Sequence, residues 1–231
     1  MRLLALDTSS LACSAALMVD EAVTERHDVR PREHTRLLIP MLRALLEESA
    51  LTLRELDAIV LGNGPGSFIG MRIGASVAQG LAYGAGIDIV PVSSLAAVAA
   101  EVFATREAGE VIVAQDAHMQ EIYLGRFRRD VSGLPVAVEA ERLHGLRAID
   151  EVPETVAGSR IAAGDGWWRY PGLLAANTAR FDEVADVRYP RARYLLAPGA
   201  VAVAAGGAVA PRDVVPAYLR QSVATPRHER P

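Results

Sequence analysis

GNGPGSFIGMRIG, residues 62–74, follows an apolar run and opens a helical segment, so it predicts a glycine-rich turn between a buried strand and a helix. A dinucleotide-binding turn needs the pattern G-x-G-x-x-G, but counting from Gly64 the third glycine falls on Ile69. A Walker-type loop needs a lysine, and all 24 Lys and Arg residues of this chain are arginine. Two alternatives stay open: a simple anion site at the helix N-terminus, or a tight turn without a ligand, which we favour.

Working outward from this turn, the first half of the chain predicts three strands followed by helices that alternate with strands. The predicted elements are strands 2–9, 11–19 and 21–29, helix 35–49, strand 56–62, helix 67–85, strand 87–93 and helix 94–105. Ser67 is a suitable N-cap for the second helix. The order βββαβαβα indicates an antiparallel flap followed by parallel crossovers.

The second half repeats the start of this order. The polar stretch TREAGE (105–110) predicts a hinge, and the strands predicted after it are 110–117, 121–130 and 135–143. Two tandem copies of βββαβαβα describe the two-lobed α/β fold of actin, sugar kinases and Hsp70 (the ASKHA fold). We therefore expect an N-terminal lobe at 1–106 and a smaller, more divergent lobe at 107–231, with a disordered tail from about residue 224.

Composition narrows the function classes. The chain is 51% hydrophobic with a net charge of -4 and a pI of about 5.8, which argues against binding nucleic acid on its own. The single cysteine, Cys13, excludes an internal disulfide and fits a reducing cytoplasm, and its apolar neighbours predict a buried side chain. The Ala/Gly-rich segment 195–210 is interrupted by Pro198, so no membrane helix is expected.

Four stretches together resemble the TsaB family, also called YeaZ, the partner subunit of the bacterial machinery that makes threonylcarbamoyladenosine in tRNA. They are LALDTSSLACSAAL (4–17), REHTRLLIPML (32–42), GPGSFIGMRIGASVAQGLA (64–82) and QDAHMQEIY (115–123). In the last stretch His118 stands where the family typically has arginine, and VVPAYLRQSVA (214–224) is a weaker fifth match. The resemblance extends over residues 1 to about 224.

This resemblance implies a non-catalytic scaffold that dimerises with a TsaD-type subunit. The complex would transfer threonylcarbamoyl to adenosine 37 of tRNAs that read codons beginning with A, and a TsaE-type ATPase would join it. Alone, the protein would be a homodimer, and it would meet tRNA only through the complex. It implies no cofactor of the chain's own, ATP or ADP at the complex interface, no membrane contact and a cytoplasmic location.

The catalytic paralogue TsaD binds a metal through two histidines spaced H-x-x-x-H after its third parallel strand. The equivalent positions here are Ser94 and Val98, and neither can replace an imidazole on a transition metal. We therefore expect no metal site, no catalytic residue and no metallopeptidase activity.

A nucleotide site is a weaker possibility. In the actin-like class the turn after the first strand lies near nucleotide phosphates, which makes Asp7 and Ser9 candidates, and Asp116 would face them from the second lobe. Gly164 and Gly166 would then form the loop on the adenosine side. The alternative, which we favour, is that these residues are turns inherited from a duplicated fold. The Trp167–Trp168 pair is expected to lie partly in the core, with a partner surface as the alternative.

The competing function is a free-standing ATP-dependent small-molecule kinase of the same fold. Such a kinase usually carries a glycine-rich phosphate turn with Asp and Thr at the start of its second lobe. VIVAQDAHMQE (111–121) has neither glycine nor threonine at that place, which argues against this alternative.

The helix that begins at Ser67 places Gly70, Gly74 and Ala78 on one face. Glycine inside a helix costs about 0.5–1 kcal/mol relative to alanine, so a close approach of another backbone is expected, by default within the lobe. The resembled family, however, joins its subunits through this helix and the preceding one. The predicted partner interface is His34, Leu37, Leu38, Met41, Leu45, Gly70, Arg72, Gly74, Val77 and Ala78. Gly74→Leu is expected to abolish association and leave the monomer folded.

Overall fold

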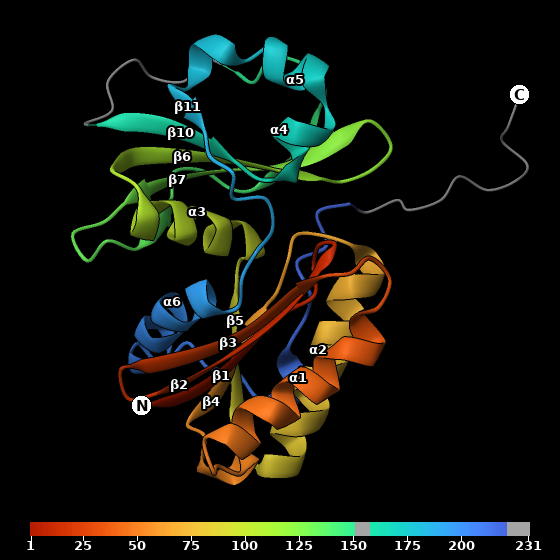
Figure 1. Cartoon of the computed structure of the whole chain (residues 1–231), viewed down its shortest axis with the longest axis vertical. Helices are drawn as coiled ribbons and strands as arrows, with labels where there is room; N and C mark the ends of the chain where they lie inside the picture. The colour runs from red at the N-terminus through yellow and green to blue at the C-terminus, as the bar shows by residue number, and fades with distance from the viewer. Residues whose placement is uncertain (151–157, 221–231) are drawn as a thin grey trace, which may run out of the picture.

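A computed structural model describes residues 1–150 and 158–220, which form two lobes, one above the other in Figure 1. Each lobe is built around one mixed β-sheet, as the predicted two-lobed α/β fold requires. The predicted disordered tail from about residue 224 lies outside the described residues. None of the described helices is both long and apolar enough to cross a membrane.

The sheet of the first lobe has the strand order β3-β2-β1-β4-β5. Its strands are β1 (Arg2–Asp7), β2 (Ala12–Val19), β3 (Ala22–Val29), β4 (Ala58–Gly62) and β5 (Asp88–Val92). The first three strands pair antiparallel, whereas β4 and β5 join in parallel, which confirms the predicted flap and crossovers. β1 and β4 are almost wholly buried because helices cover both faces of the sheet.

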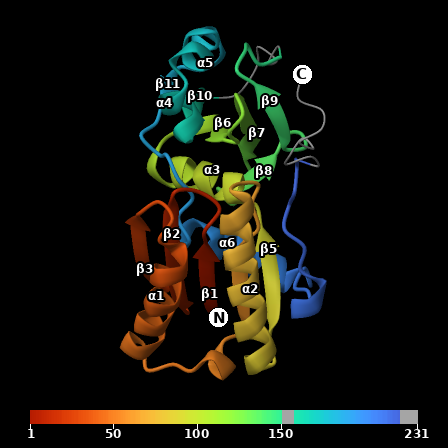
Figure 2. The same ribbon diagram turned by 90° about the vertical axis from the view of Figure 1, so that its right-hand side faces the viewer.

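Helices α1 (His34–Glu48) and α2 (Phe68–Ala85) cover one face of this sheet and lie side by side (Figure 2). The expected N-cap is confirmed, because the Ser67 side chain accepts a hydrogen bond from the Gly70 amide at 3.3 Å. The short 3-10 helix η1 (Leu53–Glu55) precedes β4. A continuous apolar core joins α1 and α2 to β1, β2 and β4.

The sheet of the second lobe has the order β11-β10-β6-β7-β8, with β9 also pairing with β7. The strands are β6 (Ala108–Asp116), β7 (Glu121–Arg129), β8 (Pro135–Ala137), β9 (Arg142–Gly145), β10 (Ser159–Ala163) and β11 (Glu183–Val184). The single strand expected over 135–143 was wrong: β8 and β9 are two short strands. Between them the Glu141 carboxylate leaves the sheet edge and accepts a hydrogen bond from Ser93 of the other half of the chain.

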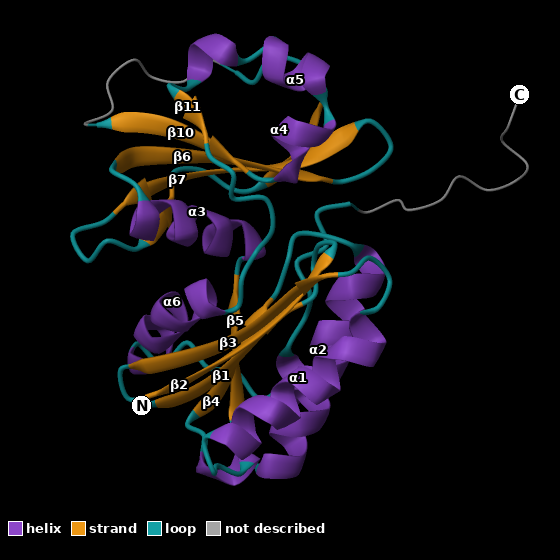
Figure 3. Ribbon diagram, viewed as in Figure 1, coloured by secondary structure: helices purple, strands orange, loops and turns teal. Residues whose placement is uncertain are grey.

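The helices of the second lobe are shorter than those of the first. They are α4 (Asp165–Arg169), α5 (Pro171–Ala175) and the 3-10 turn η2 (Thr178–Arg180). They cover the side of the sheet that faces away from the first lobe (Figure 3). Between β9 and β10, the described residues 146–150 and 158 contain no helix.

The last helix of each half packs near the boundary of the lobes. α3 (Ser94–Thr105) packs on the second sheet, whereas α6 (Arg193–Ala204), which follows β11, returns to the first sheet (Figure 1). The proposed division at residues 106 and 107 therefore describes neither the packing of α3 nor that of α6, and it stays a prediction. Pro198 lies inside this helix without ending it. α6 runs through it, and a Cβ on neighbouring Gly199 would lie 2.6 Å from Val60 Cγ2, so α6 lies tightly against β4.

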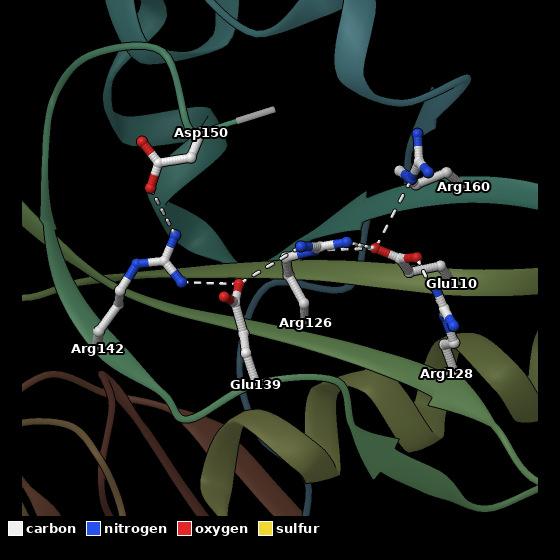
Figure 4. A network of polar contacts seen from close by, with 7 residues as sticks. All are labelled: Glu110, Arg126, Arg128, Glu139, Arg142, Asp150 and Arg160. Atoms are coloured by element: carbon white, nitrogen blue, oxygen red, sulfur yellow. Dashed lines mark hydrogen bonds and ion pairs between the residues drawn. The ribbon is translucent and has the colours of Figure 1, made fainter. Parts of the chain in front are cut away.

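A polar network stands at one end of the second sheet (Figure 4). Glu110 of β6 is fully buried, and the Arg126 guanidinium donates to its Oε1 from Nε at 3.0 Å and from Nη2 at 2.7 Å. Arg128 and Arg160 bring further guanidinium nitrogens to 3.5 and 3.7 Å from the same carboxylate. A buried charge is tolerated only when it is paired, and this cluster of arginines supplies the partners of the Glu110 carboxylate inside the lobe.

Candidate functional site

A cavity of about 1140 Å³ lies between the two lobes. The first lobe contributes the turn after β1, the start of α1, and the loop and first turns of α2. The second lobe contributes the end of β6 with the turn that follows it, Tyr123, Asp165 and Arg169. Residues 218–220 of the C-terminal segment line it as well. This is the place where the turns singled out in the sequence come together.

Asp7 ends β1 but does not line this cavity. Its Oδ1 accepts the Ser9 amide and hydroxyl, each at 2.8 Å, and its Oδ2 accepts the Ser94 hydroxyl at 2.6 Å. Burial raises the pKa of the Asp7 carboxyl, and the hydrogen bonds from Ser94 and Ser9 oppose that rise. The side chain is enclosed and satisfied, so it positions the turn after β1. Of the two candidates in that turn, only Ser9 reaches the cavity wall.

Asp116 ends β6 and lines the cavity from the second lobe, and its carboxylate is also satisfied by neighbours. It accepts the Tyr170 hydroxyl at 2.7 Å and the His118 amide at 2.8 Å, and it forms ion pairs with His118 Nδ1 and Arg169 Nε, both at 3.0 Å. His118, which stands at the position of the arginine in the family pattern, is thus one of the direct partners of Asp116. The Asp116 amide in turn donates to Asp165 Oδ1 at 3.0 Å.

Asp165 was missed in the sequence, although it lies on the cavity wall. Burial raises the pKa of its carboxyl from 3.8 to about 6. It sits between Gly164 and Gly166, whose added Cβ atoms would come within 3.0 Å of the Ala114 carbonyl oxygen. These two glycines do not line the cavity; they let the start of α4 approach β6. Trp167 is buried and donates to the Ile112 carbonyl at 3.3 Å, whereas Trp168 is exposed with the Arg188 guanidinium 4.4 Å from its ring.

We expect Asp165→Asn to stabilise the protein at neutral pH. Because the pKa of this carboxyl is higher in the folded state, folding loses stability as the pH rises from about 4 to about 6. Two pKa units correspond to roughly 3 kcal/mol, and partial solvent exposure reduces the expected gain to about 1–2 kcal/mol. Urea unfolding at several pH values should show that the free energy of unfolding of the variant, relative to that of the wild type, increases as the pH rises across this range. A difference that does not change with pH would contradict the assignment.

The glycines of residues 62–74 lie against the end of β1. A Cβ on Gly66 or Gly70 would come within 3.0 Å of the carbonyl oxygens of Ser9 and Thr8, and one on Gly74 would lie 2.6 Å from Thr8 Oγ1. The Thr8 hydroxyl also donates to the Gly70 carbonyl at 2.7 Å. The small-residue face of α2 therefore serves packing within the lobe. The expectation that Gly74→Leu leaves the monomer folded was wrong, because leucine has no room there.

The predicted interface residues divide into two groups by their burial. Leu38, Leu45, Gly70, Gly74 and Ala78 are buried in the lobe, and His34 is buried with Nε2 donating to the carbonyls of Ser10 and Ala12 at 3.0 and 3.2 Å. In this conformation none of these residues presents an exposed surface to a partner, and His34 and Gly70 only border the cavity. Leu37, Met41 and Val77 are half-buried, and Arg72 is exposed with its guanidinium 3.7 Å from the centre of the Phe68 ring. The interface itself stays a prediction.

The outward face of the two helices was missed in the sequence. On α2 it carries Ile69, 70% exposed, and Tyr83, 85% exposed, and on α1 it carries exposed Ile39. Gly80 and Gly84 lie on the same side of α2, and a Cβ on either would meet nothing within 4 Å. Helical periodicity alone could have separated this face from the one that carries Gly70 and Gly74.

The equivalents of the TsaD metal ligands are both enclosed. Ser94 Oγ donates to Asp7 and accepts the Gly64 amide at 3.0 Å, and Val98 is fully buried. Residues 1–150 and 158–220 contain no group of three or more His, Cys, Asp or Glu side chains that could hold a metal ion.

These features define a two-lobed actin-like protein with a cavity between its lobes. The family model described as TsaD, tRNA N6-adenosine threonylcarbamoyltransferase, matches residues 24–224. The tRNA threonylcarbamoyladenosine biosynthesis protein TsaB of Escherichia coli (strain K12) is 35% identical over 97% of this chain and 96% of its own length. The TsaB of Haemophilus influenzae is 33% identical over 96% and 94%. The chain belongs to the TsaB family.

Solved structures agree with this assignment. YeaZ from Pseudomonas aeruginosa has a TM-score of 0.87 to this chain at 35% identity, and the match covers 94% of this chain and 99% of that one. A crystal structure of a protein from the same organism, described as similar to peptidase YEAZ, gives the same TM-score. The resemblance identified in the sequence is confirmed, and these relatives favour the role in tRNA modification over a free-standing kinase.

Proposed function

We propose that the protein is a non-catalytic scaffold that binds a TsaD-type subunit and thereby supports threonylcarbamoyl transfer to adenosine 37 of tRNAs reading codons that begin with A. The observation that carries the proposal is the nearly full-length match to TsaB proteins named for this biosynthesis. Ser94 and Val98 support the non-catalytic role, because the serine oxygen is already bonded within the lobe and the valine has no donor atom. A cytoplasmic location, where tRNA is modified, belongs to the same proposal.

The partner surface we propose is the outward face of α1 and α2. Glycine in an exposed helix costs about 1 kcal/mol relative to alanine, and at Gly80 and Gly84 no neighbour in the lobe requires it. The close approach of a helix from another subunit to α2 would explain why these two positions are glycine. Exposed Ile39, Ile69 and Tyr83 would then be covered in the complex, and in the homodimer that the protein forms alone.

The first experiment is light scattering of the purified protein, alone and mixed with the TsaD-type subunit of the same organism, with transferase activity assayed for both. A homodimer that exchanges for a heterodimer, with activity only in the mixture, would support the proposal. A monomer that ignores this subunit would refute it. Adding the TsaE-type ATPase then tests whether it joins the pair.

We expect Ile69→Asp to weaken binding of the TsaD-type subunit at least tenfold, because it places a charge within the proposed contact, at the end of α2 that borders the cavity. Val131→Asp is the matched control, since Val131 is fully exposed on the second lobe, away from both helices. Titration calorimetry with each variant measures the change. Equal affinities for the two variants would place the partner elsewhere.

We further propose that the chain has no cofactor of its own and that ATP or ADP binds only at the complex interface. The support is that Asp7 and Asp116 are already engaged by neighbouring side chains, which leaves neither carboxylate free to hold a magnesium nucleotide. Equilibrium dialysis with ATP and Mg²⁺ should show binding by the complex and none by the isolated protein.

A further inference from the structure

The last described segment of the chain crosses from one lobe to the other. After the 3-10 turn η3 (Pro211–Asp213) on the first lobe, residues 214–220 run up the right-hand side of Figure 2 to the second lobe. The linker from β11 to α6 descends on the opposite side of the molecule in the same view. The chain also passes between the lobes from β5 to α3, and residues 214–220, called the strap below, form a further connection along the edge of the cavity.

The strap is fixed to the first lobe by burial and backbone hydrogen bonds. Val214 is part of the core beneath α2, and the Gln79 amide donates to the Pro211 carbonyl at 2.8 Å. Asn63, in the glycine-rich turn, donates from Nδ2 to the Val215 carbonyl at 2.9 Å and accepts the Ala217 amide at 3.0 Å. Tyr218 then packs on Phe68 with ring centres 5.4 Å apart, and Arg72 Nε donates to its hydroxyl at 3.3 Å.

The strap reaches the second lobe through Arg220. Its Nη2 lies 2.6 Å from Glu121 Oε2 and donates to the Ala117 carbonyl at 3.0 Å, and its Nη1 lies 3.3 Å from the Met119 sulfur. All three partners belong to the turn between β6 and β7 or to its edge. Leu219 packs against the apolar core of the second sheet beside it.

The turn that Arg220 holds is strained. His118, Met119 and Gln120 are consecutive non-glycine residues with φ of 60°, 53° and 61°, in the left-handed region. Each such residue costs about 1–2 kcal/mol, so the conformation persists only where surrounding contacts impose it. Asp116 supplies such contacts from one end, and Arg220 supplies them from the other through Glu121.

We propose that the strap is a latch that sets the opening between the lobes and closes one side of the inter-lobe cavity, with Arg220 as the releasable end. Tyr218, Leu219 and Arg220 form cavity wall, so their departure enlarges the entrance. Release occurs at the second lobe because the described contact there is made by the Arg220 and Leu219 side chains, whereas the anchor on the first lobe combines a buried side chain with several hydrogen bonds. When the contacts of Arg220 are lost, the 117–120 turn becomes mobile and the angle between the two lobes is no longer fixed. This inference does not rest on the proposed function.

The test compares Arg220→Gln with Arg212→Gln in the full chain. Arg212 is a matched control, because it is highly exposed and its ion pair with adjacent Asp213 at 3.8 Å lies within the first lobe. Spin labels on cysteines introduced at exposed Glu47 and Ser132 report the distance between the lobes. Native Cys13 will not be labelled, since it is buried and burial raises the pKa of its thiol to about 12.

In Arg220→Gln we expect a wider distribution of inter-lobe distances and at least tenfold faster hydrogen exchange at the Ala117 and Glu121 amides, which are bonded within the turn. Exchange at Leu6 in β1 should be unchanged, which shows that the lobe is folded. Glu121→Gln removes the same ion pair from the other side and should reproduce both effects. Distances and exchange rates like those of Arg212→Gln would overturn the proposal, as would a loosened turn with unchanged inter-lobe distances.

Discussion

Gly70→Ala should lower the free energy of unfolding by about 3 kcal/mol, the upper part of the range for overpacked sites. The new methyl group would come within 3.0 Å of the Thr8 carbonyl oxygen, which belongs to the backbone at the end of β1 and cannot rotate away. Either α2 or the turn after β1 must shift, and the hydrogen bond from the Thr8 hydroxyl to the Gly70 carbonyl at 2.7 Å would be strained as well.

Gly80→Ala is the matched control on the same helix. A Cβ there meets nothing within 4 Å, so the variant should gain about 0.5–1 kcal/mol from helix propensity alone. Urea denaturation of both variants measures the two changes in unfolding free energy, which should be a loss for Gly70→Ala and a gain for Gly80→Ala. If Gly70→Ala proved as stable as the wild type, the close packing of α2 on β1 would be wrong.

Arg126→Met should destabilise the second lobe by about 3 kcal/mol at neutral pH. Arg126 donates two hydrogen bonds to fully buried Glu110, and methionine keeps the apolar stem but removes the charge (Figure 4). Arg128 and Arg160 stand farther from the carboxylate, at 3.5 and 3.7 Å, so they compensate only in part. The cost arises mainly from leaving a buried charge with poorer partners.

Arg142→Met is the control for this second prediction. Arg142 pairs with Glu139 at 2.7 Å and with Asp150 at 3.3 Å in the same network, but these side chains are partly exposed. Pairs of this kind contribute about 1 kcal/mol or less. Thermal unfolding followed by circular dichroism should rank the two variants in this order. Equal losses would mean that the burial of Glu110 does not decide the energy of the network.

The first lobe could be predicted from the sequence because its elements have clear periods. β1 and β4 are continuous apolar runs, and α1 repeats its buried leucines at helical spacing. The second lobe was predicted less well. Residues 135–143 alternate like a strand, yet the segment divides into β8 and β9, and Glu141 between them accepts a hydrogen bond from Ser93 at the start of α3. A contact between residues so far apart in the chain leaves no local pattern.

The candidate site shows the same limit. Asp7 and Asp116 were placed correctly at the ends of β1 and β6, since turn chemistry identifies strand ends. Their environments depend on partners that arrive from other elements, namely Ser94 for Asp7 and Arg169 and Tyr170 for Asp116. Asp165 gave no signal of its own, because only the fold brings it beside Asp116.

The sequence by itself determined that residues 62–74 need glycine and that no lysine could make a Walker loop of them. It also determined that Ser94 and Val98 cannot replace imidazole ligands, because donor chemistry belongs to the residue type. The tertiary structure decided what the glycines of α2 pack against. This helix is apolar or small on nearly every side, so its period shows which residues share a face but not which face turns inward. The buried end of β1 takes the face with Gly70 and Gly74, which leaves Gly80 and Gly84 at the surface.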